Sequence, residues 1–147
     1  MNDKQLQHEY REWLTKQCTK FDTPVIGTLT YAYPVSVLSA QKSCRTFHKK
    51  LSKFVYKNAY NKYKKMIKFI PFMESATDKD RHIHFVVDAH HVPASSFIGY
   101  INSRWHGGIK DVKPLDDNLH DKWIKYISKR RTKPEYGDSL ILSCTKI

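Results

Sequence analysis

Residues 66–87, MIKFIPFMESATDKDRHIHFVV, decide the fold that is predicted for this chain. The apolar residues 66–73 indicate one β-strand, and the alternating residues 82–87 indicate a second. Between them, residues 75–81 have the polar composition of a turn. This arrangement predicts a β-hairpin. Pro71 places the first strand at a sheet edge or at a bulge, because proline donates no hydrogen bond to a neighbouring strand.

The rest of the chain alternates between helical and strand spacing. Apolar residues at helical spacing predict a helix ending near Lys20, one over residues 36–60, one from Pro93 to Gly107, and one that begins at Asp116. Branched and aromatic residues predict a central strand at residues 25–31 and shorter strands at 109–112 and 140–142. The expected fold is α+β, with a central antiparallel β-sheet of about five strands flanked by helices, in a single domain over residues 1–147.

The charge balance predicts a polyanionic partner. The chain has 26 Lys plus Arg residues against 14 Asp plus Glu residues, a formal net charge of +12. Nucleic acid is the commonest partner of such a charge, because phosphate contacts release condensed counterions. A membrane is the rival partner, but no stretch approaches the roughly 20 apolar residues of a spanning helix, and no apolar signal region begins the chain.

The three cysteines, Cys18, Cys44 and Cys144, are widely separated and odd in number. This spacing favours neither a disulfide framework nor a thiolate zinc site, and it fits a reducing compartment. We therefore expect a cytoplasmic protein with no membrane partner.

A metal site is predicted at the hairpin. His82 and His84 are two residues apart on a strand, so both side chains point to one face. If the turn spans residues 75–81, Glu74 lies opposite His82, with the two side chains about 5 Å apart. Two imidazoles and a carboxylate suit a divalent cation, Mn²⁺ or Mg²⁺, with Zn²⁺ left open. A shifted register would give the third position to another group or to water.

A second candidate site lies on the last predicted helix. Trp123 and Ile127 form its buried stripe, and Tyr126 and Lys129, three residues apart, stand together beside that stripe. A tyrosine on a helix is usually a packing residue. Tyr126 gains its interest only from the predicted metal site.

With these motifs, the chain resembles the HUH endonucleases, and especially the single-tyrosine Rep proteins of bacteria, phages and plasmids that start rolling-circle replication. The resemblance covers three segments in order: residues 26–31, IGTLTY, then His82-Ile83-His84, then residues 126–129, YISK. The turn at residues 105–109, WHGGI, is also similar to such proteins. No second tyrosine follows Tyr126 at helical spacing and no Walker loop is present, so neither a two-tyrosine mechanism nor a built-in helicase is implied.

The resemblance implies a ferredoxin-like or RRM-like nuclease fold and a replication initiator. Such an enzyme nicks and religates single-stranded DNA at an origin or a hairpin by transesterification. Tyr126 would form a 5′-phosphotyrosine, Lys129 would stabilise charge or position the phosphate, and His82, His84 and Glu74 would hold the divalent cation. A monomer that works with host replication proteins in a bacterial cell is expected.

Basic side chains near these motifs are candidate DNA contacts. The candidates are Arg130, Arg131 and Lys133 beside the tyrosine helix, and Lys49, Lys50, Lys53 and Lys57 on the long basic helix. The sequence does not name a base for the tyrosine. His90 and His91 follow the metal strand and are either that base or turn and surface residues.

Two other functions compete with the Rep interpretation. A single-tyrosine insertion-sequence transposase has the same His-hydrophobic-His strand and would act as a dimer with Tyr126 in trans. A non-catalytic nucleic-acid-binding domain would have structural histidines, and its positive charge alone would account for binding.

Overall fold

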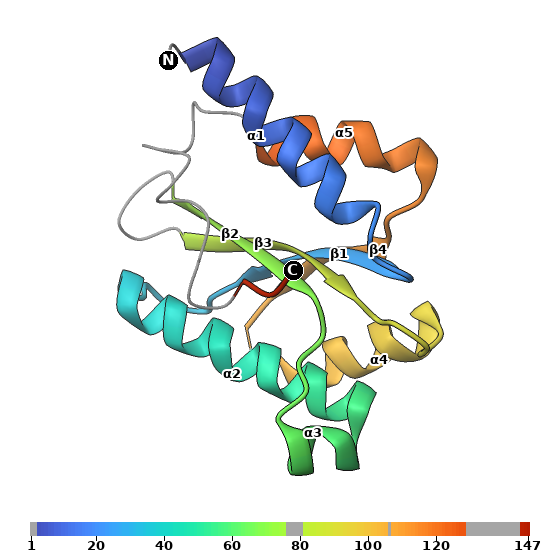
Figure 1. Ribbon diagram of the computed structural model, residues 1–147. Helices are drawn as coiled ribbons and strands as arrows, with labels where there is room; N and C mark the ends of the chain where they lie inside the picture. The colour runs from blue at the N-terminus through green and yellow to red at the C-terminus, as the bar shows by residue number, and fades with distance from the viewer. Residues whose placement is uncertain (1–2, 76–80, 106, 129–144) are drawn as a thin grey trace.

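The computed structural model describes residues 3–75, 81–105, 107–128 and 145–147 of the chain, and Figure 1 draws these as ribbon. Helices and strands alternate in the order predicted. The elements are α1 (Asp3–Cys18), β1 (Pro24–Thr30), α2 (Val37–Tyr56), α3 (Asn58–Tyr63), β2 (Phe69–Ser75), β3 (Arg81–Asp88), α4 (Ala94–Arg104), β4 (Ile109–Pro114) and α5 (Asp117–Ile127).

The four strands form one open antiparallel sheet in the order β2-β3-β1-β4. The unit from β1 to β4 has the β-α-β-β-α-β connectivity of the ferredoxin-like fold. The predicted α+β class and the central position of β1 are confirmed. The expectation of about five strands is wrong for the described residues, which form four. The fifth candidate, residues 140–142, lies outside them, and near it only Lys146 pairs with the sheet, as an isolated bridge to Phe69.

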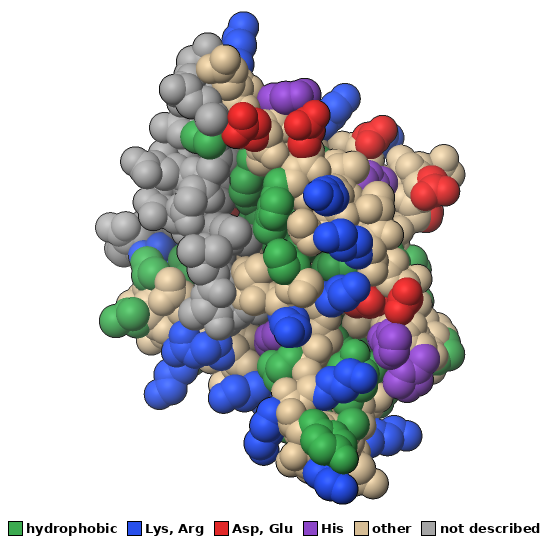
Figure 2. All heavy atoms as spheres, viewed as in Figure 1, with side chains coloured by type: hydrophobic (Ala, Val, Ile, Leu, Met, Phe, Trp, Pro, Cys, Tyr) green, Lys and Arg blue, Asp and Glu red, His purple; other side chains and the backbone are tan. Residues whose placement is uncertain are grey.

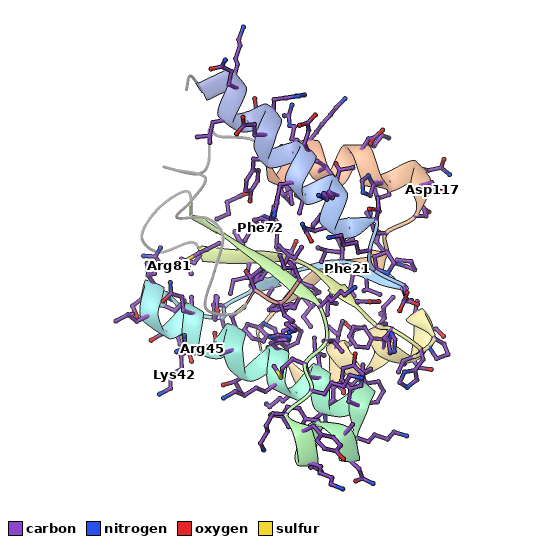
Figure 3. The ribbon with its side chains drawn as sticks, in the orientation of Figure 1. Phe21, Lys42, Arg45, Phe72, Arg81 and Asp117 are labelled. Carbon is purple, nitrogen blue, oxygen red and sulfur yellow. The ribbon has the colours of Figure 1, made fainter. Side chains whose placement is uncertain are left out.

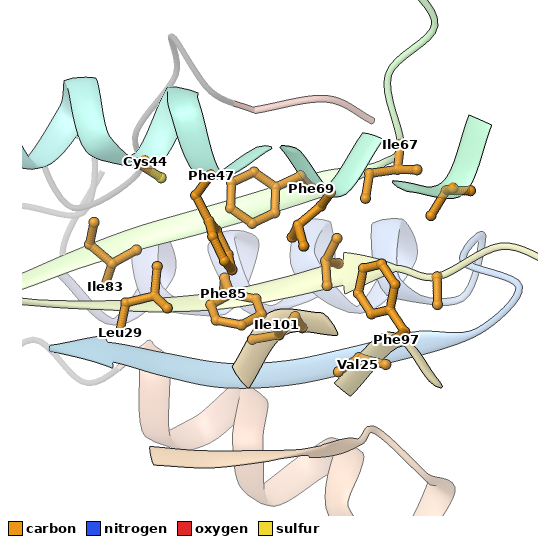
Figure 4. Close-up of a cluster of buried hydrophobic side chains, with 14 of the residues drawn as sticks. Val25, Leu29, Cys44, Phe47, Ile67, Phe69, Ile83, Phe85, Phe97 and Ile101 are labelled. Atoms are coloured by element: carbon orange, nitrogen blue, oxygen red, sulfur yellow. The ribbon is translucent and has the colours of Figure 1, made fainter. Parts of the chain in front are cut away.

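Helices cover both faces of the sheet (Figure 1). Strand side chains alternate between the faces, so odd-numbered residues such as Val25 and Phe85 pack on the side of α2 and α4. Figure 4 shows this cluster, with Phe47 and Phe69 beside Phe85. Even-numbered residues such as Phe72 pack instead against α1 and α5 (Figure 3). This alternation puts His82 and His84 on the α1/α5 face.

The long basic helix predicted over residues 36–60 is divided in two. Ser36 caps the start of α2 by accepting a hydrogen bond from the Ser39 backbone N–H. Lys57 has a φ of 49°, which stops the helix there and begins the short α3 in a new direction. The prediction of one continuous helix is therefore wrong, because no glycine or proline marks the break.

The edges of the sheet follow from its sequence. β2 lies at one edge, which confirms the position predicted from Pro71. Cys18 and Cys44 are buried free thiols, and burial raises the pKa of Cys18 to about 12. Cys144 lies outside the described residues. Among the helices in the described part of the chain, none combines the length and apolar character needed to cross a membrane.

Candidate metal and tyrosine site

The hairpin register places the predicted ligands on adjacent strands. Glu74 of β2 pairs with His82 of β3, as predicted, and on the other side of β3 His84 pairs with Thr28 of β1. All four side chains have the same parity and face α1 and α5. The neighbouring backbone bonds make Thr28 and His84 a non-hydrogen-bonded pair, the kind in which side chains approach most closely.

His84 is held firmly in this arrangement. Its ring is 5 % exposed, and Nδ1 lies 2.9 Å from the Thr28 hydroxyl oxygen. Its other nitrogen, Nε2, is buried, makes no hydrogen bond among the described residues, and lies 3.3 Å from Oε2 of Glu74. If Nδ1 donates to Thr28, the lone pair of Nε2 faces a carboxylate. Two electron-pair donors that face each other in a buried place fit a cation.

His82 is the less settled member of the predicted set. It lies opposite Glu74 along the hairpin, but the short contact of Glu74 is diagonal, to His84. The ligand atoms of Glu74, His82 and His84 do not all lie within 4.8 Å of one another. Among the described residues, only Asp22, Asp88 and His90 meet that spacing. The structure thus brings Glu74 and His84 together, with His82 on the same face beside them.

Tyr126 projects from α5 toward the same place. Its ring lies 5.4 Å from the His84 ring, edge to face at 85°, and its side chain is 49 % exposed. Asp116 caps the helix by accepting a hydrogen bond from the Leu119 backbone N–H, and Trp123 and Ile127 are buried against the sheet. The helix is therefore fixed at both ends of the segment that carries the tyrosine, which places Tyr126 beside His84.

His84 and Tyr126 line one cavity of about 300 Å³, here called the tyrosine pocket. The other residues that line it are Ile26, Gly27, Thr28, Asp111, Lys113, Leu119, Lys122 and Trp123. Of these, Thr28, Asp111, Lys113 and Lys122 were not predicted from the sequence. Lys122 was within reach of prediction, because it precedes Tyr126 by four residues and so shares its helix face.

A β-bulge shapes the opposite wall of the tyrosine pocket. Ile26 pairs with Lys113, but Thr28 pairs with Lys110, so β4 has one residue more than β1 over this stretch. Asp111 lies in the bulge with a φ of 55°. Bulges of this kind re-aim side chains beside functional sites. The extra residue brings a carboxylate and the ammonium group of Lys113 to a wall otherwise made of β1 and α5.

Comparison with known proteins agrees with this geometry. Residues 24–131 match the replication-associated protein family of the ORF2 type. The chain belongs to this family. The match runs from β1 to just beyond α5 and includes Glu74, His82, His84 and Tyr126. Neither the curated proteins nor the solved structures give a significant match. Membership links this replication-associated protein to DNA.

The predicted DNA contacts of the replication-associated protein do not gather at the tyrosine pocket. Lys49 and Lys53 are exposed on α2, which covers the opposite face of the sheet. Figure 2 shows Lys and Arg side chains over the part of the molecule formed by α2 and α3. Lys129, proposed beside Tyr126, and the candidates Arg130, Arg131 and Lys133 lie outside the described residues.

His90 and His91 lie at the other end of β3 from His82. His90 Nδ1 is 2.8 Å from Oδ2 of Asp22, and His91 is exposed, so the interpretation of both as turn and surface residues is the one that the structure favours. The nearby Asp88 carboxylate accepts hydrogen bonds from the backbone N–H groups of Asp22, Thr23 and His90. Those bonds account for its burial without a metal ion.

Proposed function

We propose that this replication-associated protein is an initiator that nicks and religates single-stranded DNA with Tyr126 as the nucleophile. One observation carries the proposal: Tyr126 and the buried His84 line the same pocket, with ring centroids 5.4 Å apart. A packing tyrosine needs no such neighbour. The exposed half of the Tyr126 side chain leaves its hydroxyl accessible to a phosphodiester that enters the pocket.

A divalent cation, Mn²⁺ or Mg²⁺, is proposed at Glu74 and His84, with His82 completing the set. Support comes from the buried Nε2 of His84, which faces the Glu74 carboxylate and makes no hydrogen bond among the described residues. The Thr28 hydroxyl fixes the other ring nitrogen, the usual arrangement behind a ligating histidine. When bound, such a cation withdraws charge from phosphate oxygens as the phosphorus becomes five-coordinate.

The reaction exchanges one phosphodiester for another. The Tyr126 oxygen attacks phosphorus and loses its proton to a base, a new phosphorus–oxygen bond forms, and the bond to the 3′ oxygen breaks. The 3′ oxygen takes up a proton and leaves as a hydroxyl. The other strand end stays attached to Tyr126 as a 5′-phosphotyrosine. Because the bond count is unchanged, the reverse attack by a 3′ hydroxyl reseals DNA without ATP.

Lys113 and Lys122 are proposed to hold the phosphate. Both line the tyrosine pocket with Tyr126, so their ammonium groups can offset charge on the phosphate before and during attack. Asp111 lines the same wall and is a candidate acceptor for the phenolic proton. Lys129 remains a proposed phosphate contact beyond the described end of α5.

Single-stranded DNA is the proposed substrate because the scissile phosphate must approach Tyr126 through a pocket of about 300 Å³. An unpaired strand can bend its backbone into such a space, whereas a duplex presents a wide, stiff surface. Of the two competing interpretations, the family match favours replication over transposition. A dimer with Tyr126 acting in trans would contradict this choice, and light scattering of the protein–DNA complex measures it.

A covalent adduct tests the proposal directly. Labelled single-stranded oligonucleotides that tile the replicon encoding the protein are incubated with Mn²⁺ and resolved on a denaturing gel. We expect a protein–DNA adduct that is lost with EDTA and with Tyr126→Phe. Tyr100→Phe is the matched control, because Tyr100 lies on α4, on the other side of the sheet. If none of the tiled oligonucleotides gives an adduct, the enzyme proposal fails.

A double substitution separates chemistry from binding. His82→Ala with His84→Ala should abolish the adduct and leave salt-dependent DNA binding largely intact, because phosphate contacts by Lys and Arg supply most of the non-specific affinity. His8→Ala with His91→Ala is the control pair, since both side chains are exposed and neither lines the tyrosine pocket. Full activity in the His82/His84 variant would sink the metal assignment.

A further inference from the structure

A second and larger cavity, of about 430 Å³, lies on the other side of the sheet. It is here called the aromatic pocket. The rings that line it come from three places: Tyr31 and Tyr33 after β1, Phe47 in α2, and Trp105 after α4. The other residues that line it are Ala32, Ser39, Lys42, Ser43, Thr46, Lys50, Arg104 and Gly107. Small and aromatic residues thus form its floor.

Two rings of the aromatic pocket are held in place before any ligand arrives. Trp105 donates from Nε1 to the Thr30 carbonyl oxygen, 2.9 Å away, and packs edge to face on Tyr31 with ring centroids 5.4 Å apart. The Tyr31 hydroxyl lies 2.7 Å from Ser43 Oγ. Gly107 makes this possible, because a Cβ there would lie 2.1 Å from the Thr30 carbonyl oxygen. Fixed aromatic surfaces bind with little loss of side-chain entropy.

The rim of the aromatic pocket is positively charged and contains no acidic residue among its lining residues. Lys42 and Lys50 project from α2, and Arg104 ends α4 over the Tyr100 ring; Figure 3 labels Lys42. Tyr33 is 71 % exposed at the same rim. Aromatic faces surrounded by cations are the combination that binds successive bases and phosphates of single-stranded nucleic acid.

The aromatic pocket also lies close to the tyrosine site along the sheet. Thr30 pairs with His82 across β1 and β3, and the Thr30 carbonyl accepts the Trp105 hydrogen bond. Tyr31 follows Thr30 directly. The end of β1 is therefore shared: its even-numbered residues face the proposed metal ligands, and the next residue forms the wall of the aromatic pocket.

From this arrangement we propose that the aromatic pocket receives one nucleobase of single-stranded DNA. The base stacks on Tyr33 against the fixed rings of Tyr31 and Trp105, and Lys42, Lys50 and Arg104 hold the flanking phosphates. The site would anchor the strand on one side of β1 while the scissile phosphate lies on the other. The inference rests on the single-stranded DNA partner of the proposed function, and it does not depend on the chemistry at Tyr126.

The test measures binding without cleavage. Full-length protein carrying Tyr126→Phe, in EDTA, is titrated with fluorescent oligo(dT), and Tyr33→Ala is compared with Tyr63→Ala. Tyr63 is the matched control because it is 69 % exposed and lies on α3. Loss of one stacked base should weaken binding by about 5-fold to 100-fold in Tyr33→Ala, and Tyr63→Ala should bind like the parent.

A second measurement locates the base. An oligonucleotide with 5-iododeoxyuridine at single positions is photocrosslinked, and the modified peptide is identified by mass spectrometry. Crosslinks to Tyr31, Tyr33 or Trp105 from one nucleotide position are expected. Equal affinities of the two tyrosine variants, with crosslinks confined to other residues, would overturn the aromatic-pocket proposal alone. No binding by any variant, the parent included, would overturn the DNA partner of the proposed function as well.

Discussion

The hydroxyl oxygen of Thr28 lies 2.9 Å from Nδ1 of His84, on the strand next to it. This bond orients the imidazole so that Nε2 faces Glu74. Thr28→Val keeps the shape of the side chain but removes the hydroxyl. We expect Mn²⁺ affinity to fall about 10-fold to 100-fold, with the fold retained. Isothermal titration calorimetry measures the affinity, and Thr28→Ser, which retains the hydroxyl, is the control. Unchanged affinity in Thr28→Val would remove Thr28 from the site.

Lys122 tests whether the tyrosine pocket holds phosphate. Lys122→Ala should slow adduct formation by at least about tenfold, the effect of one lost hydrogen bond to a charged group. Lys125→Ala is the control, because Lys125 is exposed on the same helix but does not line the pocket. Single-turnover rates at saturating DNA separate this effect from binding. Equal rates for the two variants would argue against a phosphate contact at Lys122.

Gly27 tests the close packing beneath the site. A Cβ at Gly27 would lie 2.7 Å from Cζ of Phe85 and 2.9 Å from Cγ2 of Val112. Gly27→Ala should therefore lower the free energy of unfolding by about 1–3 kcal/mol. Gly99→Ala, on α4 with nothing within 4 Å of the new Cβ, should raise it by about 0.5–1 kcal/mol. Urea denaturation gives both values, and a neutral Gly27→Ala would contradict the packing.

His48 predicts a loss of stability in mild acid. Burial lowers the pKa of its ring, the nearby Lys146 lowers the pKa further, and the hydrogen bond to the Ile67 carbonyl opposes both. Above pH of about 6.5 the ring is neutral in the folded and unfolded states alike. Below it the unfolded chain takes up a proton that the folded ring resists, so the free energy of unfolding falls by at most about 1.4 kcal/mol per pH unit.

The variant His48→Gln isolates that contribution. Urea denaturation at pH 7.5 and pH 5.5 should give a smaller difference in the variant than in the parent protein, because glutamine does not titrate. His91→Gln, at an exposed position, should leave the parent's difference unchanged. An identical pH dependence in His48→Gln and the parent would show that His48 does not resist protonation in the fold.

The hairpin was the part of the site that the sequence could predict. A strand repeats every two residues, so the length of the turn alone placed Glu74 opposite His82. Register does not determine rotamers, and the Glu74 carboxylate reaches diagonally to His84 instead. The same periodicity put both histidines and Tyr126 on one side of the sheet, because α5 packs on the face that its buried stripe covers.

The residues that prediction missed depend on contacts between distant segments. Thr28 matters only because β1 lies beside β3, a neighbour that the chain order does not reveal. Asp111 and Lys113 reach the tyrosine pocket through a bulge that no glycine announces. The break at Lys57 is similar, since a lysine at a positive φ is sustained by its surroundings and has no local signature.

Pro71 has a consequence for how the molecule avoids its own copies. In β2 the odd-numbered residues direct their backbone groups away from β3, as the bonds between Phe69 and Lys146 show. At the next outward position Pro71 offers no N–H, so an incoming strand finds one donor already used and the next one missing. The exposed edge of the sheet is thereby a poor template for strand addition, which favours a basic protein that gathers on DNA without polymerising through its sheets.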